Sequence, residues 1–274
     1  MKVEDLIRGV AIQSGNDATV VLAEGLAGSE DAFAERMNAR AKELGMNNSH
    51  FMNASGWPVP EHYSTPRDLA TLAFHLLSDY PEYYHYFGEK EYTYNNIHQA
   101  NRDPLLGKVA GADGIKTGHT DIAGNGLIGS ARRDGRRLIL VINGLPDEKA
   151  RAEEGARLME WGFHNFENRT LFKKGEAIGQ AKVWLGQEEE VPLVAEKDFT
   201  AVLPIAKRTD MKMTIRYNAP LVAPIQNGAL VAKLHIEIPD QPAQDINLLA
   251  GSNVVRKGLL GRVADRAGYL LGSR

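Results

Sequence analysis

The sequence contains no cysteine, which excludes disulfides, thiol catalysis and zinc sites built on cysteine. It contains no run of 18 apolar residues, so no helix is expected to span a bilayer. With 32 basic and 35 acidic residues the net charge is −3, which excludes a chain-wide basic field for nucleic acid. No secretory leader precedes the first helical pattern, so the protein is either cytosolic or lacks its natural N-terminus.

The length and composition of the chain are those of an ordinary globular protein. Its 274 residues are 43% apolar and 24% charged, enough for one large domain or two modest ones. A chain of this length buries roughly 70–75% of its unfolded surface, so it needs no metal or disulfide for stability.

Helical periodicity dominates the first eighty residues. Val3, Leu6, Ile7 and Val10 have the i, i+3, i+4, i+7 spacing of one helix face. A break follows, and a second helical run covers about 17–26. Two more helices are predicted, one with Ser29 as its N-cap and one that starts at Thr65-Pro66.

The pattern then changes to strands. Extended segments are predicted at 114–118, 126–131 and 138–143, with a hairpin turn at 132–135. A helix over about 148–166 closes this half. The sequence therefore predicts a mixed α/β domain over residues 1–168.

Residues 169–252 are predicted to form a small all-β domain. Leu234, Ile236 and Ile238 alternate with polar residues, and the same period of two runs from Met211 to Tyr217. Half of the 12 prolines lie in this region, which favours short strands joined by turns.

The last stretch, 253–274, has an amphipathic pattern. Its basic residues outnumber its single acid by four, which leaves −7 for the rest of the chain. A basic amphipathic helix favours a membrane surface; a terminal helix docked on the protein is the alternative. The apolar face of this helix comprises Leu259, Leu260, Val263, Ala264, Ala267, Leu270 and Leu271.

Two tripeptides stand out as candidates for chemistry. Ser14-Gly15-Asn16 joins two predicted helices, and Lys116-Thr117-Gly118 lies on a predicted strand. Each is weak alone, because a helix break and a strand end explain them equally well. Their order and context are more specific, since Asp17-Ala18 follows the first and His119-Thr120-Asp121 follows the second.

This pair of motifs resembles the S-x-N and K-T-G motifs of penicillin-binding proteins and serine β-lactamases. The match is better to the low-molecular-weight D-alanyl-D-alanine carboxypeptidases and covers essentially the whole chain. The resemblance implies an α/β (α+β) transpeptidase-like fold, incomplete at its N-terminus, followed by a small β-sandwich-like domain and a membrane-anchoring helix at 253–274.

The resemblance also implies roles for individual residues. Ser14 relays a proton, Asn16 holds a substrate carbonyl, and Lys116 places a positive charge beside Ser14. The other implied residues bind substrate: Thr117 and Arg102 contact its carboxylate, Gly118 leaves room for an extended peptide, and the His119 N–H is an oxyanion donor.

One family motif is missing. Nine serines occur in the sequence, and none has a lysine three positions later, so the S-x-x-K motif with its nucleophile and base is absent. We therefore expect a family member without its N-terminal part, and we expect residues 1–274 alone to be inactive.

The implied activity is removal of the terminal D-alanine from peptidoglycan stem peptides through an acyl-enzyme, in a bacterial envelope at the periplasmic face of the inner membrane. β-Lactams would acylate the complete family member. No cofactor or metal is expected, because the sequence has neither H-E-x-x-H nor a phosphate-binding loop. Two alternatives remain: a non-catalytic module that binds cell-wall peptide or is structural, and a β-lactamase relative.

Overall fold

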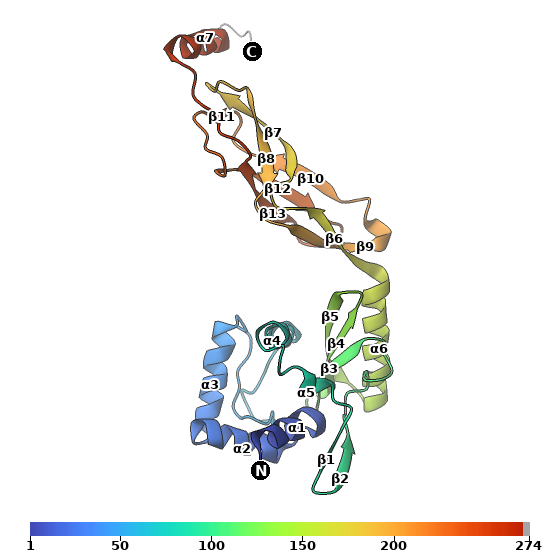
Figure 1. Cartoon of the computed structure of the whole chain (residues 1–274). Coiled ribbons are helices and arrows are strands. Elements are labelled where there is room, and N and C mark those ends of the chain that lie inside the picture. Colours follow the sequence, from blue (N-terminus) through green and yellow to red (C-terminus); the bar gives the residue numbers. More distant parts are fainter. Residues whose placement is uncertain (271–274) are drawn as a thin grey trace. The chain divides into compact units, whose positions relative to one another are not determined.

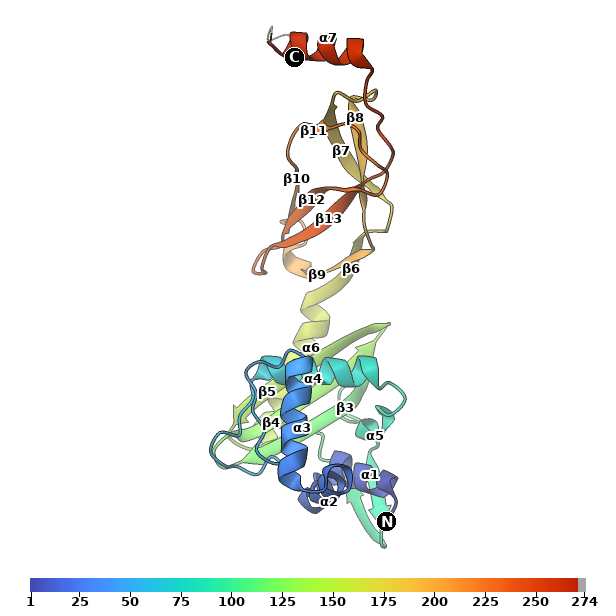
Figure 2. The same ribbon diagram turned by 90° about the vertical axis from the view of Figure 1, so that its left-hand side faces the viewer.

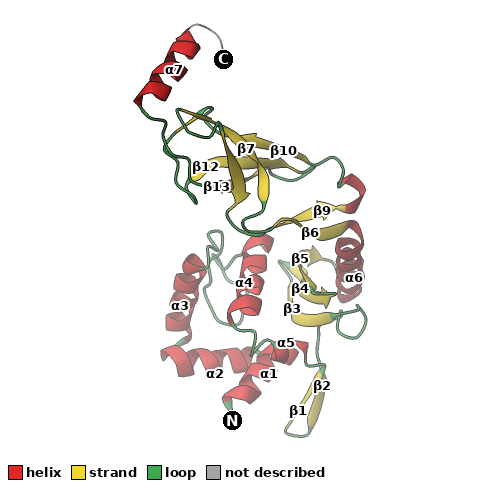
Figure 3. Cartoon of the chain, turned by 45° about the horizontal axis from the view of Figure 1, so that its top comes forward, coloured by secondary structure: helices red, strands yellow, loops and turns green. Residues whose placement is uncertain are grey.

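The computed structural model describes residues 1–270 and divides the chain into two compact units, Met1–His164 and the part from Asn165 onward. The first unit carries most of the helices, and the second is built almost entirely of strands (Figures 1 and 3). This agrees with the predicted mixed fold followed by an all-β region.

Helices form the N-terminal part of the first unit, and two of them begin at the predicted caps. The Ser29 hydroxyl accepts a hydrogen bond from the Ala32 N–H, and Thr65 accepts one from the Asp68 N–H at the start of the helix with Pro66 in its first turn. These helices are α1 (Val3–Gln13), α2 (Asn16–Ala27), α3 (Glu30–Glu43), α4 (Pro66–Asp79) and the single-turn α5 (His85–Gly88).

A three-stranded antiparallel sheet in the order β3-β4-β5 lies at the centre of the first unit. Successive residues of β4 point to opposite faces: Leu127 packs with Met159 of α6, and Ile128 packs with Ala73 of α4. Helices therefore cover both faces (Figure 2). The elements are β3 (Ala112–Thr120), β4 (Gly124–Arg133), β5 (Arg136–Leu145) and α6 (Glu148–Asn165).

A small hairpin, β1 (Glu91–Tyr94) and β2 (Ile97–Ala100), was not predicted. Each strand has only four residues, and β2 is exposed throughout, so the pattern is too short to be recognised as a pair of strands. The hairpin matters because it borders the candidate site.

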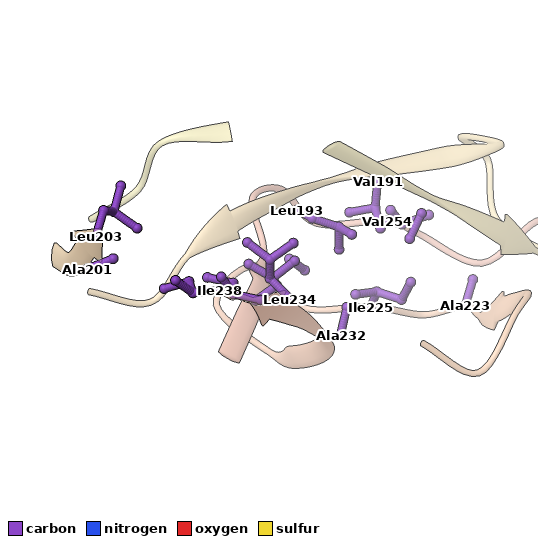
Figure 4. Packing of buried hydrophobic residues seen from close by; sticks show 14 residues of the cluster. Val191, Leu193, Ala201, Leu203, Ala223, Ile225, Ala232, Leu234, Ile238 and Val254 are labelled. Atoms are coloured by element: carbon purple, nitrogen blue, oxygen red, sulfur yellow. The ribbon is translucent and has the colours of Figure 1, made fainter. Parts of the chain in front are cut away.

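The second unit holds a six-stranded sheet in the order β10-β12-β13-β8-β7-β11 and a separate pair, β6 with β9. Fourteen buried apolar residues form its core, including Val191, Leu193, Leu234 and Val254 (Figure 4). The strands are β6 (Phe166–Phe172), β7 (Ala177–Trp184), β8 (Glu190–Ala195), β9 (Phe199–Pro204), β10 (Lys212–Arg216), β11 (Leu221–Val222), β12 (Leu230–Glu237) and β13 (Gln244–Ala250), with a 3-10 turn at Ile205–Lys207.

Three details differ from the sequence expectations. The second unit begins at Asn165 rather than 169, because residues 166–168 already belong to β6. It continues past 252, because Val254 is buried in its core and pairs with Ile225. Met213 is exposed despite the alternating pattern, since β10 is the edge strand of its sheet.

The C-terminal helix α7 spans Leu259–Leu270, so it begins at residue 259 and not at the start of the predicted stretch of 253–274. Leu259, Leu260 and Val263 are exposed, so this part of the predicted apolar face is uncovered. Lys257 pairs with Asp265 at 2.9 Å, which neutralises one of the predicted basic residues. Leu271 and Arg274 lie outside the described residues. No helix within residues 1–270 is both long and apolar enough to cross a membrane.

Candidate functional site

The Ser14-Gly15-Asn16 segment is the turn between α1 and α2. Ser14 ends α1 in the left-handed conformation (φ 58°), and the Gly15 N–H donates to the Gly9 carbonyl. Left-handed backbone is uncommon for a residue with a side chain and is found at sites where the surrounding structure enforces it. The turn thereby presents the Ser14 hydroxyl at the surface of the helical layer.

Lys116, which lies on β3, contacts the Ser14 hydroxyl, although the two residues are 102 positions apart in the sequence. Its Nζ donates to Ser14 Oγ and also to the Thr117 carbonyl at 2.9 Å. The predicted contact between the S-x-N serine and the K-T-G lysine is therefore present.

The charge on Lys116 is held in an unusual environment. Burial, and after it the nearby guanidinium groups of Arg102 and Arg151, lowers its pKa to about 8, while the Asp103 carboxylate acts in the opposite direction. A lysine with this pKa exchanges its proton at near-neutral pH, as proton transfer to or from a serine hydroxyl requires.

Asp103 and Arg151 were missed by sequence reasoning. Both are at least 95% buried, and burial raises the pKa of Asp103 to about 6. One Asp103 oxygen accepts the Leu105 N–H at 2.9 Å, whereas Asp103 Oδ2 and Arg151 Nε lack a hydrogen-bond partner within residues 1–270. No motif marks either residue, because an Asp before Pro is typical of a turn and an Arg on a helix is typical of an exposed position.

A cavity of about 530 Å³ opens beside the Ser14–Asn16 turn. Its lining includes Ser14, Asn16 and Arg102, and Tyr92, Tyr94 and Gln99 of the hairpin form part of its wall. The structure thus gathers three of the predicted site residues around one cavity.

The remaining predicted residues lie along β3. Thr117 is buried, and Gly118 and His119 are on the exposed part of the strand. Because β3 is an edge of its sheet, its outer side has no strand partner among the described elements. The structure leaves the individual roles of these residues as predictions.

The hairpin is tied to α1 by a charged and aromatic cluster. Arg8 pairs with Glu89 and Glu4, each at 2.7 Å, and its guanidinium lies 4.9 Å from the Tyr86 ring centroid. The Tyr92 hydroxyl donates to Asp5 at 2.7 Å. These contacts fix the wall of the cavity relative to the Ser14 turn.

Within residues 1–270, no group of three or more His, Cys, Asp or Glu is placed to hold a metal ion. The polar groups at the site are a serine, a lysine, arginines, amides, tyrosine hydroxyls and the carboxylates of Asp5, Asp17 and Asp103. The cations among these groups are suited to holding an anionic peptide end, and the serine and lysine are suited to moving a proton.

Comparisons with known proteins find family matches for both units of the chain. A family model described as D-alanyl-D-alanine carboxypeptidase matches residues 1–146, and one described as penicillin-binding protein 5, C-terminal domain, matches residues 166–256. The D-alanyl-D-alanine carboxypeptidase DacA of Haemophilus influenzae is 37% identical over 97% of this chain. The match covers 68% of that relative, so the chain spans about two thirds of its length.

Solved structures are similar as well. The crystal structure of penicillin-binding protein 5 from H. influenzae superposes with a TM-score of 0.78 at 36% identity, covering 93% of this chain and 75% of that one. Penicillin-binding protein D2 from Listeria monocytogenes, in its cefotaxime-bound form, gives 0.56 at 35% identity over 60% of this chain and 67% of its own. The family resemblance is confirmed: the chain belongs to the D-alanyl-D-alanine carboxypeptidase family of hydrolases, among the low-molecular-weight penicillin-binding proteins.

Proposed function

We propose that this chain carries the proton-relay and substrate-binding part of a serine-type D-Ala-D-Ala carboxypeptidase site. The observation that supports this most directly is the hydrogen bond from Lys116 to Ser14, which joins the two motifs. In the reaction, a serine oxygen bonds to the carbonyl carbon of the penultimate D-alanine, and the bond to the terminal D-alanine breaks. Water then hydrolyses the acyl-enzyme.

The residues of this chain serve that reaction in distinct ways. Ser14 and Lys116 pass a proton to the leaving amine of the terminal D-alanine. Arg102 and the Thr117 hydroxyl hold its carboxylate, and Asn16 holds a substrate carbonyl. The open edge of β3 pairs with the extended peptide, which Gly118 accommodates because nothing lies within 4 Å of a Cβ built there. The His119 N–H donates to the oxyanion.

The nucleophile is not assigned to any residue of the printed sequence, since none of its nine serines has lysine three positions later. We expect residues 1–274 alone neither to form a covalent adduct with fluorescent penicillin nor to release D-alanine from a peptide ending in D-Ala-D-Ala. A polypeptide that also contains the upstream coding sequence should do both. Covalent labelling of residues 1–274 at one of these serines would overturn this assignment and identify the nucleophile.

β-Lactams are proposed as acylating ligands of the complete site, by analogy with the cefotaxime-bound D2 protein. Within residues 1–274 the expected interaction is reversible. Ser14→Ala and Lys116→Ala should each weaken peptide binding, with the larger loss for Lys116→Ala because it removes a cation beside the substrate carboxylate. Equal affinity of the wild type for peptide acid and peptide amide would contradict the proposed carboxylate site.

A non-catalytic envelope module is the second candidate function. The observation that favours it is the same absence of S-x-x-K from the printed sequence. This candidate predicts that the polypeptide with its upstream coding sequence binds peptide but releases no D-alanine. Release of D-alanine by that polypeptide would exclude it.

The proposed location is the periplasmic face of the bacterial inner membrane, held there by α7. Exposed Leu259, Leu260 and Val263 supply an apolar face, and arginines flank it. The whole chain is expected to co-sediment with anionic vesicles, and residues 1–257, which retain the core residue Val254, should lose this co-sedimentation. Binding should weaken as salt rises, since each basic residue contributes on the order of 1 kcal/mol. Unchanged co-sedimentation of residues 1–257 would rule out the anchor.

A further inference from the structure

The second unit has an open sheet edge at β10. This strand (Lys212–Arg216) is the first in its six-stranded sheet and pairs with β12 on one side, and no other strand of the described chain pairs with its outer side. Its register with β12 runs without a shift, so no bulge interrupts the edge. The backbone N–H and C=O groups on the outer side of β10 can therefore pair with a further strand.

Two cations lie directly opposite each other at this edge. Arg216 on β10 is the register partner of Lys233 on β12, both are exposed, and neither forms an ion pair with an acid within residues 1–270. Like charges in such a cross-strand pair repel each other and destabilise the free sheet. The hydrogen bond with His235 at 2.6 Å, and after it the charges of Lys233 and Arg216, lower the pKa of Asp245. Asp245 therefore offsets part of the repulsion, but its carboxylate is already engaged by His235.

The same two cations border a hollow of about 430 Å³. Arg216, Lys233 and Asp245 are its charged lining residues, which leaves one net positive charge. Leu230, which is 57% exposed, and Val231 supply an apolar wall. The surface beside the free edge thus combines an apolar patch with unneutralised positive charge.

An apolar side chain is left uncovered at this edge as well. Met213 is the register partner of the buried Ile236, so it lies on the core face of the sheet, yet it is 47% exposed because no described strand lies beyond it. Lys212 and Arg216 lie on the opposite face, since side chains alternate along a strand. Lys212 is also exposed and has no ion pair among the described residues. A strand added here would meet an apolar side chain on one face and cations on the other.

We propose that β10 is a docking edge for an extended segment of another protein in which acidic and apolar residues alternate. Added to β10 as a further strand, this segment places its acidic side chains beside Lys212 and Arg216 and an apolar side chain beside Met213. A second copy of β10 is a poor occupant, because pairing the strand with itself brings its own cations together. The edge therefore selects for charge as well as for an extended backbone. The proposal concerns the second unit and is independent of the function proposed above.

Three short peptides test the requirements for charge and for alternation. Acetyl-Glu-Val-Glu-Val-Glu-Val-Glu-amide, its counterpart with Lys in place of Glu, and a block peptide with four Glu followed by three Val are titrated into residues 1–274 at low salt. Affinity is followed by amide NMR shifts. The alternating acidic peptide should bind at least tenfold more tightly than the basic one and about threefold to tenfold more tightly than the block peptide. Its affinity should fall as salt rises.

Hydrogen exchange distinguishes strand addition from electrostatic attraction alone. In the free protein, the outward amide N–H groups of β10 are open to solvent exchange because no described strand pairs with them. Saturation with the alternating acidic peptide should slow exchange of amides within residues 212–216 at least tenfold, because the added strand accepts their hydrogen bonds. Binding that leaves exchange of all five amides unchanged would overturn docking by strand addition.

Matched variants locate the effect. Arg216→Gln should weaken binding of the alternating acidic peptide about threefold to tenfold. Arg169→Gln makes the same change at an exposed position of β6, in the separate β6–β9 pair, and should leave affinity unchanged. Without peptide, Arg216→Gln should unfold at the same or a higher urea concentration than the wild type, because it relieves the repulsion by Lys233. If Arg216→Gln fails to fold, Lys212→Gln supplies the same test of binding from the other end of β10.

Three outcomes would overturn the proposal. The first is equal affinity for the acidic and the basic peptide, and the second is unchanged affinity for the acidic peptide in both Arg216→Gln and Lys212→Gln. The third is self-association of the wild type in sedimentation without any peptide, lost in Arg216→Gln, which would identify a second copy of the chain as the occupant instead.

Discussion

Burial shifts the proton affinities of two side chains at the site in opposite senses. It raises the pKa of Asp103 to about 6 and lowers that of Lys116 to about 8. In each case burial favours the neutral form, because a charged group loses hydration when it leaves water. The site therefore holds an acid and a base whose proton equilibria both lie near neutral pH.

Asp103 should make stability depend on pH. Its folded pKa lies above the ordinary value of 3.8, so between about pH 4 and 6 the unfolded chain releases this proton first. Deprotonation of Asp103 should lower the free energy of unfolding over that range by on the order of 2–3 kcal/mol. This loss should be complete above pH 6. In urea titrations, Asp103→Asn should lack this component of the pH slope. If the free energy of unfolding depended on pH equally in the wild type and the variant, this prediction would be contradicted.

Lys116 should titrate well below an ordinary lysine. The Cε resonance of labelled Lys116 should show a midpoint near pH 8, because burial disfavours the ammonium form. The Asp103 carboxylate raises this pKa, so Asp103→Asn should move the midpoint lower. A midpoint at the ordinary value of 10.5 would show that Lys116 is hydrated in solution.

At the scale of elements, local signals predicted the helices and the central strands well. Ser29 and Thr65 cap α3 and α4 as expected, and Leu127 and Ile128 lie in a strand as expected. The hairpin β1–β2 escaped prediction because it is held by contacts of Tyr92 with Arg8 and Asp5 of α1, which no local pattern reveals. Exposure of Met213 likewise depends on which strand is at the sheet edge.

The turn before β3 should tolerate no side chain at Gly111. Gly111 (φ 75°) and Gly135 (φ 79°) both have left-handed backbone, but a Cβ on Gly111 would overlap the Arg132 carbonyl oxygen, whereas one on Gly135 meets nothing within 4 Å. Gly135→Ala should cost about 1–2 kcal/mol for the backbone alone. Gly111→Ala should cost about 1–3 kcal/mol more, because a paired strand must shift. Equal losses in urea unfolding would show that the turn is pliable.

At the scale of the whole molecule, the two units have separate cores. Leu127 is 1% exposed in the first unit, and Leu234 is 2% exposed in the second. We expect two unfolding transitions in calorimetry. Leu127→Ala should lower the midpoint temperature of one transition, and Leu234→Ala that of the other. Each variant should reduce the free energy of unfolding of its own unit by about 2–5 kcal/mol. A single transition lowered by both variants would mean that the units unfold together.

The sequence by itself determined the elements whose signals are local, namely capped helices, alternating strands and the two motif tripeptides at Ser14 and Lys116. Only the tertiary structure decided that these two residues touch, that Asp103 and Arg151 are buried beside them, and that Asp17 faces a cavity. The physical reason is that periodicity and capping act between neighbours in the chain. Burial, pKa and contact across 102 residues arise from the packing of distant elements against one another.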